Sequence, residues 1–316
     1  AVRDHKDLTI VLAELQLIGA KPIWNMDIDQ NPKDSTTMSL FLLQGGLGLP
    51  DREYYFADDK AEIRDKYIKH IQKIFTFLGC NIESAEIKAK IVFTIETELA
   101  RVSWKRSRLR DIAAQCNYFT LEGLEDLAPL INWRKYFEIL GVDISKSIIV
   151  GQPSFFAKAQ ELLKNISIDD WKIYLDWKLI GAMANQLSDE FIDEIFNFYG
   201  KVLSGQKQLK PLWERTVIVI DQLMGEALGR LYVERHFGSE AQTKIQQLVD
   251  DVVAAFENRV YYLDWMSPIT KEKTIEKLRT ITWKLGFPKC WRDYSKLCVN
   301  VDAHILNIVR AREFNS

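Results

Sequence analysis

The sequence lacks any long hydrophobic run and any large excess of charge of one sign. No stretch approaches the roughly 18 apolar residues that a membrane-spanning helix needs, so we predict no membrane segment in it. Its 42 basic and 44 acidic residues leave a formal net charge of −2. Nucleic-acid-binding domains usually concentrate basic residues on one face, so we expect no nucleic-acid partner. The chain starts at Ala1 without a signal peptide, which suggests that it was processed or cut from something longer.

Cysteine is scarce and unpatterned. The four cysteines are Cys80, Cys116, Cys290 and Cys298, and no Cys-x-x-Cys pair occurs among them. This spacing argues against a zinc ribbon or a thioredoxin-type site. Cys290 and Cys298 are close enough in sequence to pair, but the sequence does not reveal a pairing. We expect all four to be small buried residues, so cysteine usage does not fix the compartment.

Paired histidines are missing as well. The four histidines are His5, His70, His236 and His304. Zinc catalysis on a helix needs two histidines four residues apart with a glutamate beside them, and no such pattern exists. His236 and Glu240 are four apart, but Gly238 and Ser239 predict a helix break between them. We expect His70 to be exposed to solvent. No metal ligand is therefore predicted in this chain.

Other catalytic signatures are also absent. The sequence contains no Gly-x-Ser-x-Gly elbow and no phosphate-binding Walker loop. Residues 45–48 are glycine-rich, but Pro50 follows where a phosphate loop would start its helix. Trp171, Tyr174 and Trp177 are able to line a substrate groove, although such residues on a helix more often belong to the core. We predict no catalytic and no cofactor-binding residue.

The patterns that are present predict a mainly α fold with a small β-hairpin near the N-terminus. The content of 47% hydrophobic and 27% charged residues is typical of a globular protein. Residues 6–18 suit a short helix, and residues 22–28 and 36–43 read as two strands around a turn at 31–34. Residues 147–151 form a brief β-like segment. Apolar residues at helical spacing then predict long amphipathic helices over residues 63–78, 87–102, 217–231 and 245–260.

Capping residues predict where several helices begin and end. Gly79 is placed to end one helix, and Ser84, Thr120 and Asn132 each precede a helical run. Ser239 and Gln242 form a capping box, and Ser267 with Pro268 starts another helix. A composition shift at residues 200–207 makes 200–212 the best internal boundary.

Several stretches are more distinctive than propensity explains. They are residues 48–55 (GLPDREYY), 210–215 (KPLWER), 225–234 (GEALGRLYVE), 263–271 (LDWMSPITK), 284–288 (KLGFP) and 291–295 (WRDYS). In this order and spacing they resemble the neprilysin and endothelin-converting-enzyme family of zinc metallopeptidases. Residues 198–206 look most like its bacterial, PepO-type branch. The resemblance covers roughly residues 40–316.

The resemblance implies that residues 1–316 are the N-terminal, cavity-capping region of such an enzyme. In this family the zinc-binding residues follow the region matched here, so the catalytic zinc domain is expected to be absent from this chain. The intact parent would bind zinc and hydrolyse oligopeptides, and the missing zinc lobe would be a partner of this region. The family's known substrate contacts lie outside the segment, so a choice among Arg52, Tyr54 and Trp177 on the inner wall would be a guess. An extracytoplasmic location, periplasmic or extracellular, is favoured over a cytoplasmic one.

Three readings remain open at this stage. In the first, the chain is the inactive capping part of a zinc metalloendopeptidase. In the second, it is a non-catalytic helical module that binds peptides or a protein and descends from such an enzyme. A clipped chain, separated from its zinc lobe, is a third. The substrate peptide and the oligomeric state are not encoded in any pattern.

Overall fold

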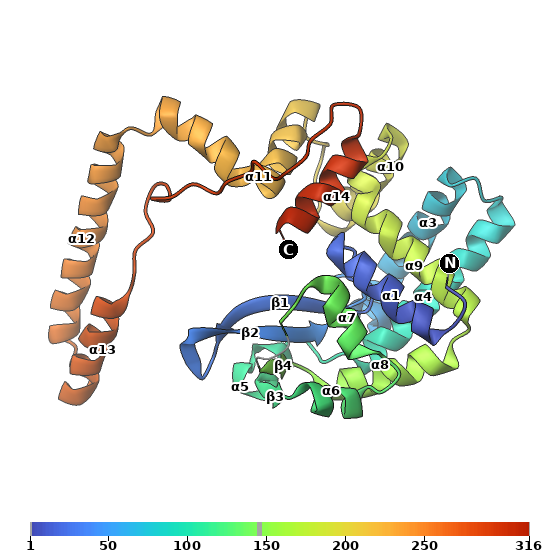
Figure 1. Cartoon of the computed structure of the whole chain (residues 1–316), viewed down its shortest axis with the longest axis horizontal. Coiled ribbons are helices and arrows are strands. Elements are labelled where there is room, and N and C mark those ends of the chain that lie inside the picture. Colours follow the sequence, from blue (N-terminus) through green and yellow to red (C-terminus); the bar gives the residue numbers. More distant parts are fainter. Residues whose placement is uncertain (1, 144–146, 316) are drawn as a thin grey trace. The chain divides into compact units, whose positions relative to one another are not determined.

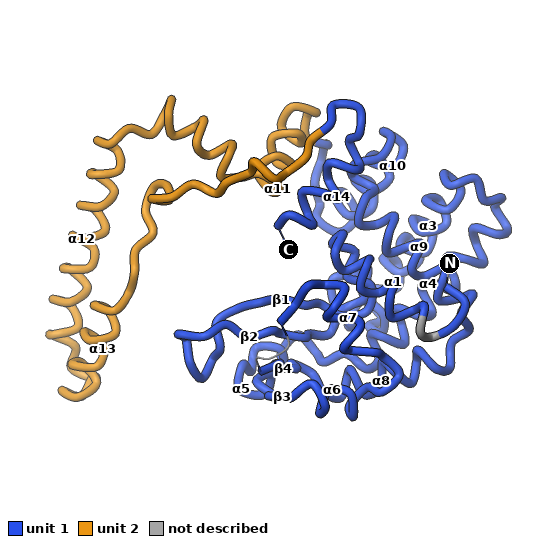
Figure 2. Tube along the Cα trace, in the orientation of Figure 1, with its two compact units in different colours: residues 1–209, 300–316 blue, residues 210–299 orange. Residues whose placement is uncertain are grey.

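The computed structural model describes residues 2–143 and 147–315, and these residues are mainly helical with one small sheet (Figure 1). They divide into two compact units (Figure 2). Unit 1 consists of residues 1–209 and 300–316, and unit 2 consists of residues 210–299. The mainly α class with an N-terminal hairpin is confirmed.

The sheet of unit 1 has four strands in the order β1-β2-β4-β3. The strands are β1 (Trp24–Asn31), β2 (Asp34–Gln44), β3 (Asn117–Phe119) and β4 (Ile148–Val150). β1 and β2 form the expected antiparallel hairpin, with Trp24 opposite Gln44 and an irregularity at Gln30/Asn31. β4 pairs parallel to β2 and antiparallel to β3. The sequence predicted β4 but not β3, which is too short to show an alternating pattern.

Helices surround this sheet and supply most of unit 1. They are α1 (His5–Leu17), α2 (Glu53–Phe56), α3 (Ala61–Phe77), α4 (Ile82–Val102), α5 (Ile112–Gln115), α6 (Leu121–Leu127), α7 (Trp133–Leu140), α8 (Pro153–Asn165), α9 (Ile168–Met183), α10 (Asp189–Ile195) and α14 (His304–Asn315). Three short 3₁₀ turns, η1 (Asp58–Lys60), η2 (Arg108–Arg110) and η3 (Ala184–Gln186), join them, and a π-helix, η4 (Phe196–Leu203), follows α10. α4 packs against α3, α8 and α9, and α1 packs against α7.

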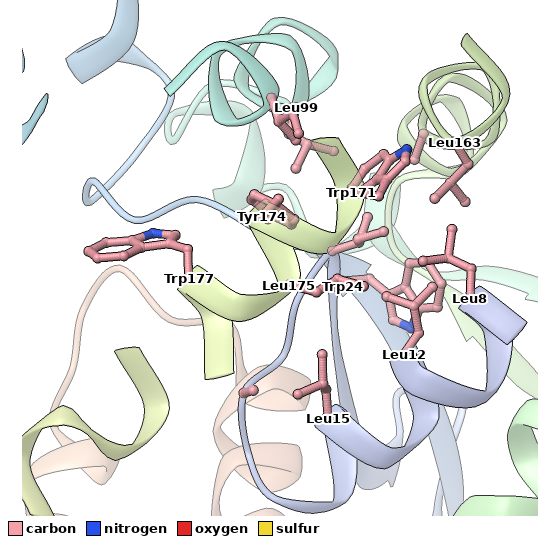
Figure 3. Close-up of a cluster of buried hydrophobic side chains, with 14 of the residues drawn as sticks. Leu8, Leu12, Leu15, Trp24, Leu99, Leu163, Trp171, Tyr174, Leu175 and Trp177 are labelled. Carbon is pink, nitrogen blue, oxygen red and sulfur yellow. The ribbon is translucent and has the colours of Figure 1, made fainter. Parts of the chain in front are cut away.

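The core of unit 1 is rich in large aromatic side chains. Trp24 at the start of β1 packs on Trp133 and Tyr136 of α7, and its indole N–H donates to the Tyr136 hydroxyl at 3.0 Å. Figure 3 draws Trp171, Tyr174 and Leu175 of α9 in the same buried cluster as Leu8 and Leu12 of α1. Trp171 and Tyr174 are fully buried and Trp177 is 3% exposed. The assignment of these α9 aromatics to the core is confirmed.

The helix ends follow the sequence signals in most places. Thr120, Asn132 and Ser267 each accept a hydrogen bond from a backbone N–H in the first turn, and Gly79 has the left-handed φ of 86°. Ser84 is not a cap, since the Asn81 side chain accepts the Ser84 N–H at 2.8 Å. An asparagine three residues earlier therefore starts α4.

Unit 2 contains three helices, α11 (Leu212–His236), α12 (Ser239–Tyr261) and α13 (Pro268–Thr280). α11 is kinked at Met224, whose φ of −139° is not helical. α12 begins one residue after Gly238 and its first turn has no side-chain cap, so the capping box predicted at Ser239 does not form. Within the unit α13 packs beside α12.

The apolar stripes of unit 2 are not buried as the sequence predicted. Among residues 210–299, Val260 is the one buried hydrophobic side chain. Leu248, Val252 and Phe256 of α12 are 61%, 60% and 46% exposed, and Val217 and Leu231 of α11 are also exposed. A helix with a single neighbour in its own unit covers only part of its apolar face, which is why the pattern and the burial disagree here.

The cysteines are free, and the expectation that they are buried is wrong. Cys80 and Cys116 are half-buried, whereas Cys290 and Cys298 are exposed. Cys80 lies in the turn after α3, where its sulfur accepts a hydrogen bond from Lys88 Nζ at 3.2 Å. Turn positions of this kind lack the covering neighbours that a helix face has.

Candidate functional site: a pocket beside the glycine-rich segment

Unit 1 contains a pocket of about 860 Å³, a volume typical of ligand-binding sites. Its longest wall is the glycine-rich segment 44–52, which leaves the end of β2. The other walls come from residues 19–21 after α1, residues 103–109 after α4, the C-terminal half of α9 with η3, and the start of η4. All of these residues belong to unit 1.

A buried carboxylate holds the glycine-rich wall in place. Glu96 of α4 is fully buried, and Tyr55 Oη donates to its Oε2 at 2.7 Å. The same Tyr55 hydroxyl accepts the backbone N–H groups of Gly48 and Leu49, each at 3.1 Å. Tyr67 Oη donates to Glu96 Oε2 at 2.9 Å, and the Trp177 indole N–H donates to Oε1 at 3.3 Å. Glu96 thus connects α2, α3, α4 and α9 to the segment through one set of hydrogen bonds.

Electrostatics in this network keep its phenols neutral. Burial raises the pKa of Tyr55 and of Tyr67 well above the usual value, and the Glu96 charge adds to both shifts. Burial also raises the pKa of the Glu96 carboxyl, opposed by the Lys178 charge and the two phenol hydrogen bonds. Neutral phenols are required here because Tyr55 and Tyr67 act as donors to the carboxylate.

The segment also approaches α9 and η4 closely. Tyr174 Oη lies within hydrogen-bond distance of the Pro22 carbonyl oxygen and 2.6 Å from that of Gly46, and Lys178 Nζ donates to the latter at 3.3 Å. Tyr199 Oη donates to the Gly48 carbonyl at 3.3 Å. The backbone of residues 46–48 is therefore fixed from two sides, which gives the pocket a preformed wall.

Basic side chains outnumber acidic ones in the lining of the pocket, although the whole chain has a formal net charge of −2. Its lining includes the basic residues Lys21, Arg52, Arg106 and Lys178 and one acidic residue, Asp51. Arg52 Nη1 donates to the Ser103 carbonyl at 3.1 Å. Burial lowers the pKa of Lys178, and the Glu96 carboxylate opposes that shift.

Of the three inner-wall residues considered from the sequence, Arg52 and Trp177 line the pocket. Tyr54 is not among the lining residues, and Lys60 Nζ lies 5.6 Å from the centre of its ring. Arg106 and Lys21 were missed by sequence reasoning. Neither carries a local motif, and both come to the pocket from segments that are distant in sequence.

His70 is buried, and the expectation of an exposed histidine is wrong. It is 2% exposed, its Nδ1 lies 2.9 Å from Glu194 Oε1, and its ring stacks on Phe198 of η4. Burial raises the pKa of Glu194, but hydrogen bonds from His70 and Lys73 outweigh it and the net shift is downward. The helical spacing indicates this burial, because His70 follows Tyr67 by three residues and lies on the buried stripe of α3.

The described residues do not fit a zinc ion. Across residues 2–143 and 147–315, no three or more His, Cys, Asp or Glu side chains gather as a metal site would require. His236 ends α11, whereas Glu240 lies in α12 and pairs with Lys244 at 2.7 Å. No helix within these ranges has both the length and the apolar content needed to cross a membrane.

The fold and the pocket describe a mainly helical domain with a preformed cavity, and comparisons with known proteins identify its family. The N-terminal model of Peptidase family M13 matches residues 1–288. The chain therefore belongs to peptidase family M13, which confirms the resemblance to the neprilysin and endothelin-converting-enzyme group.

Individual relatives support this family assignment. The chain is 26% identical over 308 residues to neprilysin-3 from Drosophila melanogaster, covering 91% of this chain and 39% of that protein. It is 33% identical to zinc metalloprotease Zmp1 of Mycobacterium tuberculosis, solved in complex with an inhibitor, with a TM-score of 0.93 over 100% of this chain and 48% of that one. PepO from Lactobacillus rhamnosis shares the fold, at 19% identity and a TM-score of 0.79, over 98% of this chain and 52% of that one. The chain thus spans between two fifths and about half the length of these relatives.

Proposed function

We propose that this chain is the cavity-capping part of a zinc-dependent metalloendopeptidase that hydrolyses oligopeptides. The observation that carries the proposal is the family match over residues 1–288, to proteins roughly twice the length of this chain. In this proposal a part of the protein outside these 316 residues supplies the zinc site. We favour an extracytoplasmic location, in line with the family resemblance.

The exposed helices of unit 2 support a role as a docking element. Trp213, Val252 and Trp265 are 69%, 60% and 77% exposed. Apolar side chains exposed in this number ordinarily face a partner surface. We propose that the zinc-binding lobe of the same enzyme is that partner. Unit 1 then caps a chamber that admits peptides, excludes folded proteins by size and removes water from the reacting groups.

The test uses the 316-residue chain and the zinc-binding remainder of its protein. The chain alone is expected to contain no stoichiometric zinc and to leave a fluorogenic oligopeptide uncut. The complete enzyme is expected to cut that peptide in a chelator-sensitive way, but not the same sequence held in a rigid loop of a folded protein. Tight zinc or chelator-sensitive cleavage by the chain alone would overturn the proposal.

A second candidate is a helical peptide- or protein-binding module without chemistry, and the exposed faces of unit 2 also suit it. The reading frame after Ser316 separates the two. Continuation into a His-Glu-x-x-His motif supports the peptidase, and an immediate stop codon supports the module.

A further inference from the structure

We propose that the basic pocket of unit 1 is a specificity site that binds an acidic side chain of an oligopeptide. The inference rests on the proposed function for its choice of a peptide as ligand. It goes further by naming the residues that select among peptides and the charge that they select.

The charged side chains of the pocket lining favour an acidic ligand. Four basic side chains and one acidic side chain line the pocket, in a chain whose formal net charge is −2. A concave site lined by one sign of charge focuses its potential on a ligand of the opposite sign. The overall negative charge gives no general attraction for acidic peptides, so a preference for them has to arise locally.

Part of this charge makes no contact that the fold requires. Arg106 and Lys21 are exposed, and no ion pair or hydrogen bond to either side chain occurs among the described residues. Arg52 donates one Nη1 bond to the Ser103 carbonyl, while its Nε is buried without a hydrogen-bond partner. Its nearest carboxylate oxygen, on Glu53, is 4.0 Å away.

The backbone of the pocket is strained at Lys21. Its φ of 45° makes it the one non-glycine residue with a positive φ among those described. Lysine is an uncommon choice for this conformation, in which glycine and asparagine are more favourable. Strain of this kind clusters at ligand sites, and here it places a basic side chain at the pocket.

The pocket also has a rigid wall. The wall formed by residues 46–48 is fixed by Tyr55, Tyr174 and Tyr199 through the bonds described above. A preformed wall reduces the ordering that a flexible peptide would otherwise impose on the protein. Trp104 also lines the pocket and, being partly exposed, offers apolar surface for a residue next to the acidic one.

The experiment measures binding to the 316-residue chain by fluorescence anisotropy. The probe is an octapeptide with an N-terminal fluorophore, an amidated C-terminus and two glutamates in an alanine background. Two comparison peptides have glutamine in place of glutamate. One has an amidated C-terminus, and the other has a free C-terminal carboxylate. We expect the glutamate probe to bind about tenfold more tightly than the amidated glutamine peptide, and the preference to fall as salt is raised.

Matched variants locate the site. Arg106→Gln and Lys21→Asn are each expected to weaken the glutamate probe by about threefold to tenfold, and asparagine tolerates the φ of Lys21. Asp51→Asn should strengthen binding, because it removes the one acidic side chain of the pocket and keeps the oxygen that accepts the Glu53 N–H. Arg110→Gln is the control, since Arg110 is exposed, carries the same charge and lies outside the pocket.

Several outcomes would overturn the inference. The first is equal binding of the glutamate and the glutamine peptides. The second is an equal effect of Arg106→Gln and Arg110→Gln on binding of the glutamate probe. The third is tight binding of only the glutamine peptide that has a free C-terminal carboxylate. Binding needs neither zinc nor cleavage, so these results leave the proposed peptidase role standing. Conversely, zinc-dependent cleavage by the chain alone would remove the capping role without touching the charge preference.

Discussion

The glycine-rich wall of the pocket depends on single residues that surround Glu96. Gly48 has no room for a side chain, because a Cβ there would overlap the Tyr67 hydroxyl and lie 2.9 Å from Glu96 Oε1. Both neighbours are fully buried and tied to other groups, so neither has room to retreat. The glycine is needed for space rather than for an unusual backbone angle.

Gly48→Ala is therefore expected to destabilise the protein by about 2–4 kcal/mol, the range for overpacking that also breaks buried hydrogen bonds. Urea unfolding followed by circular dichroism measures the change. Gly181→Ala is the control, because nothing lies within 4 Å of that Cβ on α9. Alanine in a helix should stabilise by roughly 0.5–1 kcal/mol. Effects of the same sign at both positions would contradict this account.

The carboxylate of Glu194 predicts a pH effect. Its pKa in the folded state lies below the ordinary value of 4.5, so its contribution to stability is complete above that pH and is lost as pH falls through the folded pKa. Glu194→Gln should lower the free energy of unfolding at neutral pH, and the gap to wild type should narrow below about pH 4.5. Urea titrations across this range, at constant ionic strength, measure the gap. His70 and Lys73 are the charged or titratable groups that contact Glu194. A gap that stays constant down to the lowest pH would exclude this role.

At the scale of elements, helix starts show what the sequence reveals and what it leaves undecided. Ser267, Thr120 and Asn132 were predicted correctly because each is the first capping residue before its apolar run. For α4 the predicted cap was Ser84, which is wrong, because the apolar stripe alone does not show that Asn81, three residues earlier, starts the helix. Hydrogen-bond geometry decides for Asn81.

Asn81→Ala should destabilise the protein by about 1 kcal/mol, and Ser84→Ala should change the stability by less than about 0.5 kcal/mol. Both changes lie at the start of the same helix. Comparing the free energies of unfolding of the two variants, measured by chemical denaturation, therefore isolates the contribution of the capping hydrogen bond. A larger loss for Ser84→Ala would reverse the assignment.

The sequence predicted elements better than it predicted the site. The hairpin, β4 and the long helices follow from local periodicity. The pocket does not, because its wall is built by contacts such as that between Tyr199 and Gly48, which are 151 residues apart. His70 was predicted to be exposed because its neighbours in the sequence are polar. Its position on the apolar stripe of α3 buries it instead.

At the scale of the whole molecule, the two units differ in how much apolar surface they bury. Unit 1 contains all but one of the buried hydrophobic side chains among the described residues, and unit 2 contributes Val260. Regions with few buried contacts open more readily than a packed core.

Amide hydrogen exchange of the 316-residue chain should therefore be much faster in residues 239–261 of α12 than in residues 82–102 of α4. Mass spectrometry of peptic peptides resolves the two helices, which are of similar length. Adding the zinc-binding remainder of the protein should slow exchange in α12 and leave α4 nearly unchanged. Equal protection of both helices in the chain alone would contradict the burial difference.

The position of α14 in unit 1 has a consequence for synthesis. Arg312 Nη1 donates to the Ile18 carbonyl at 2.8 Å and to the Ala182 carbonyl at 3.2 Å, and the Ile308 and Ala311 side chains are buried. The ribosome must therefore translate all of residues 210–299 before unit 1 is complete. At about 5–20 residues per second this delay is on the order of 5 to 20 seconds. During that interval the surface that α14 will cover is open to chaperones, and a ribosome that stalls there leaves the nascent domain unfinished.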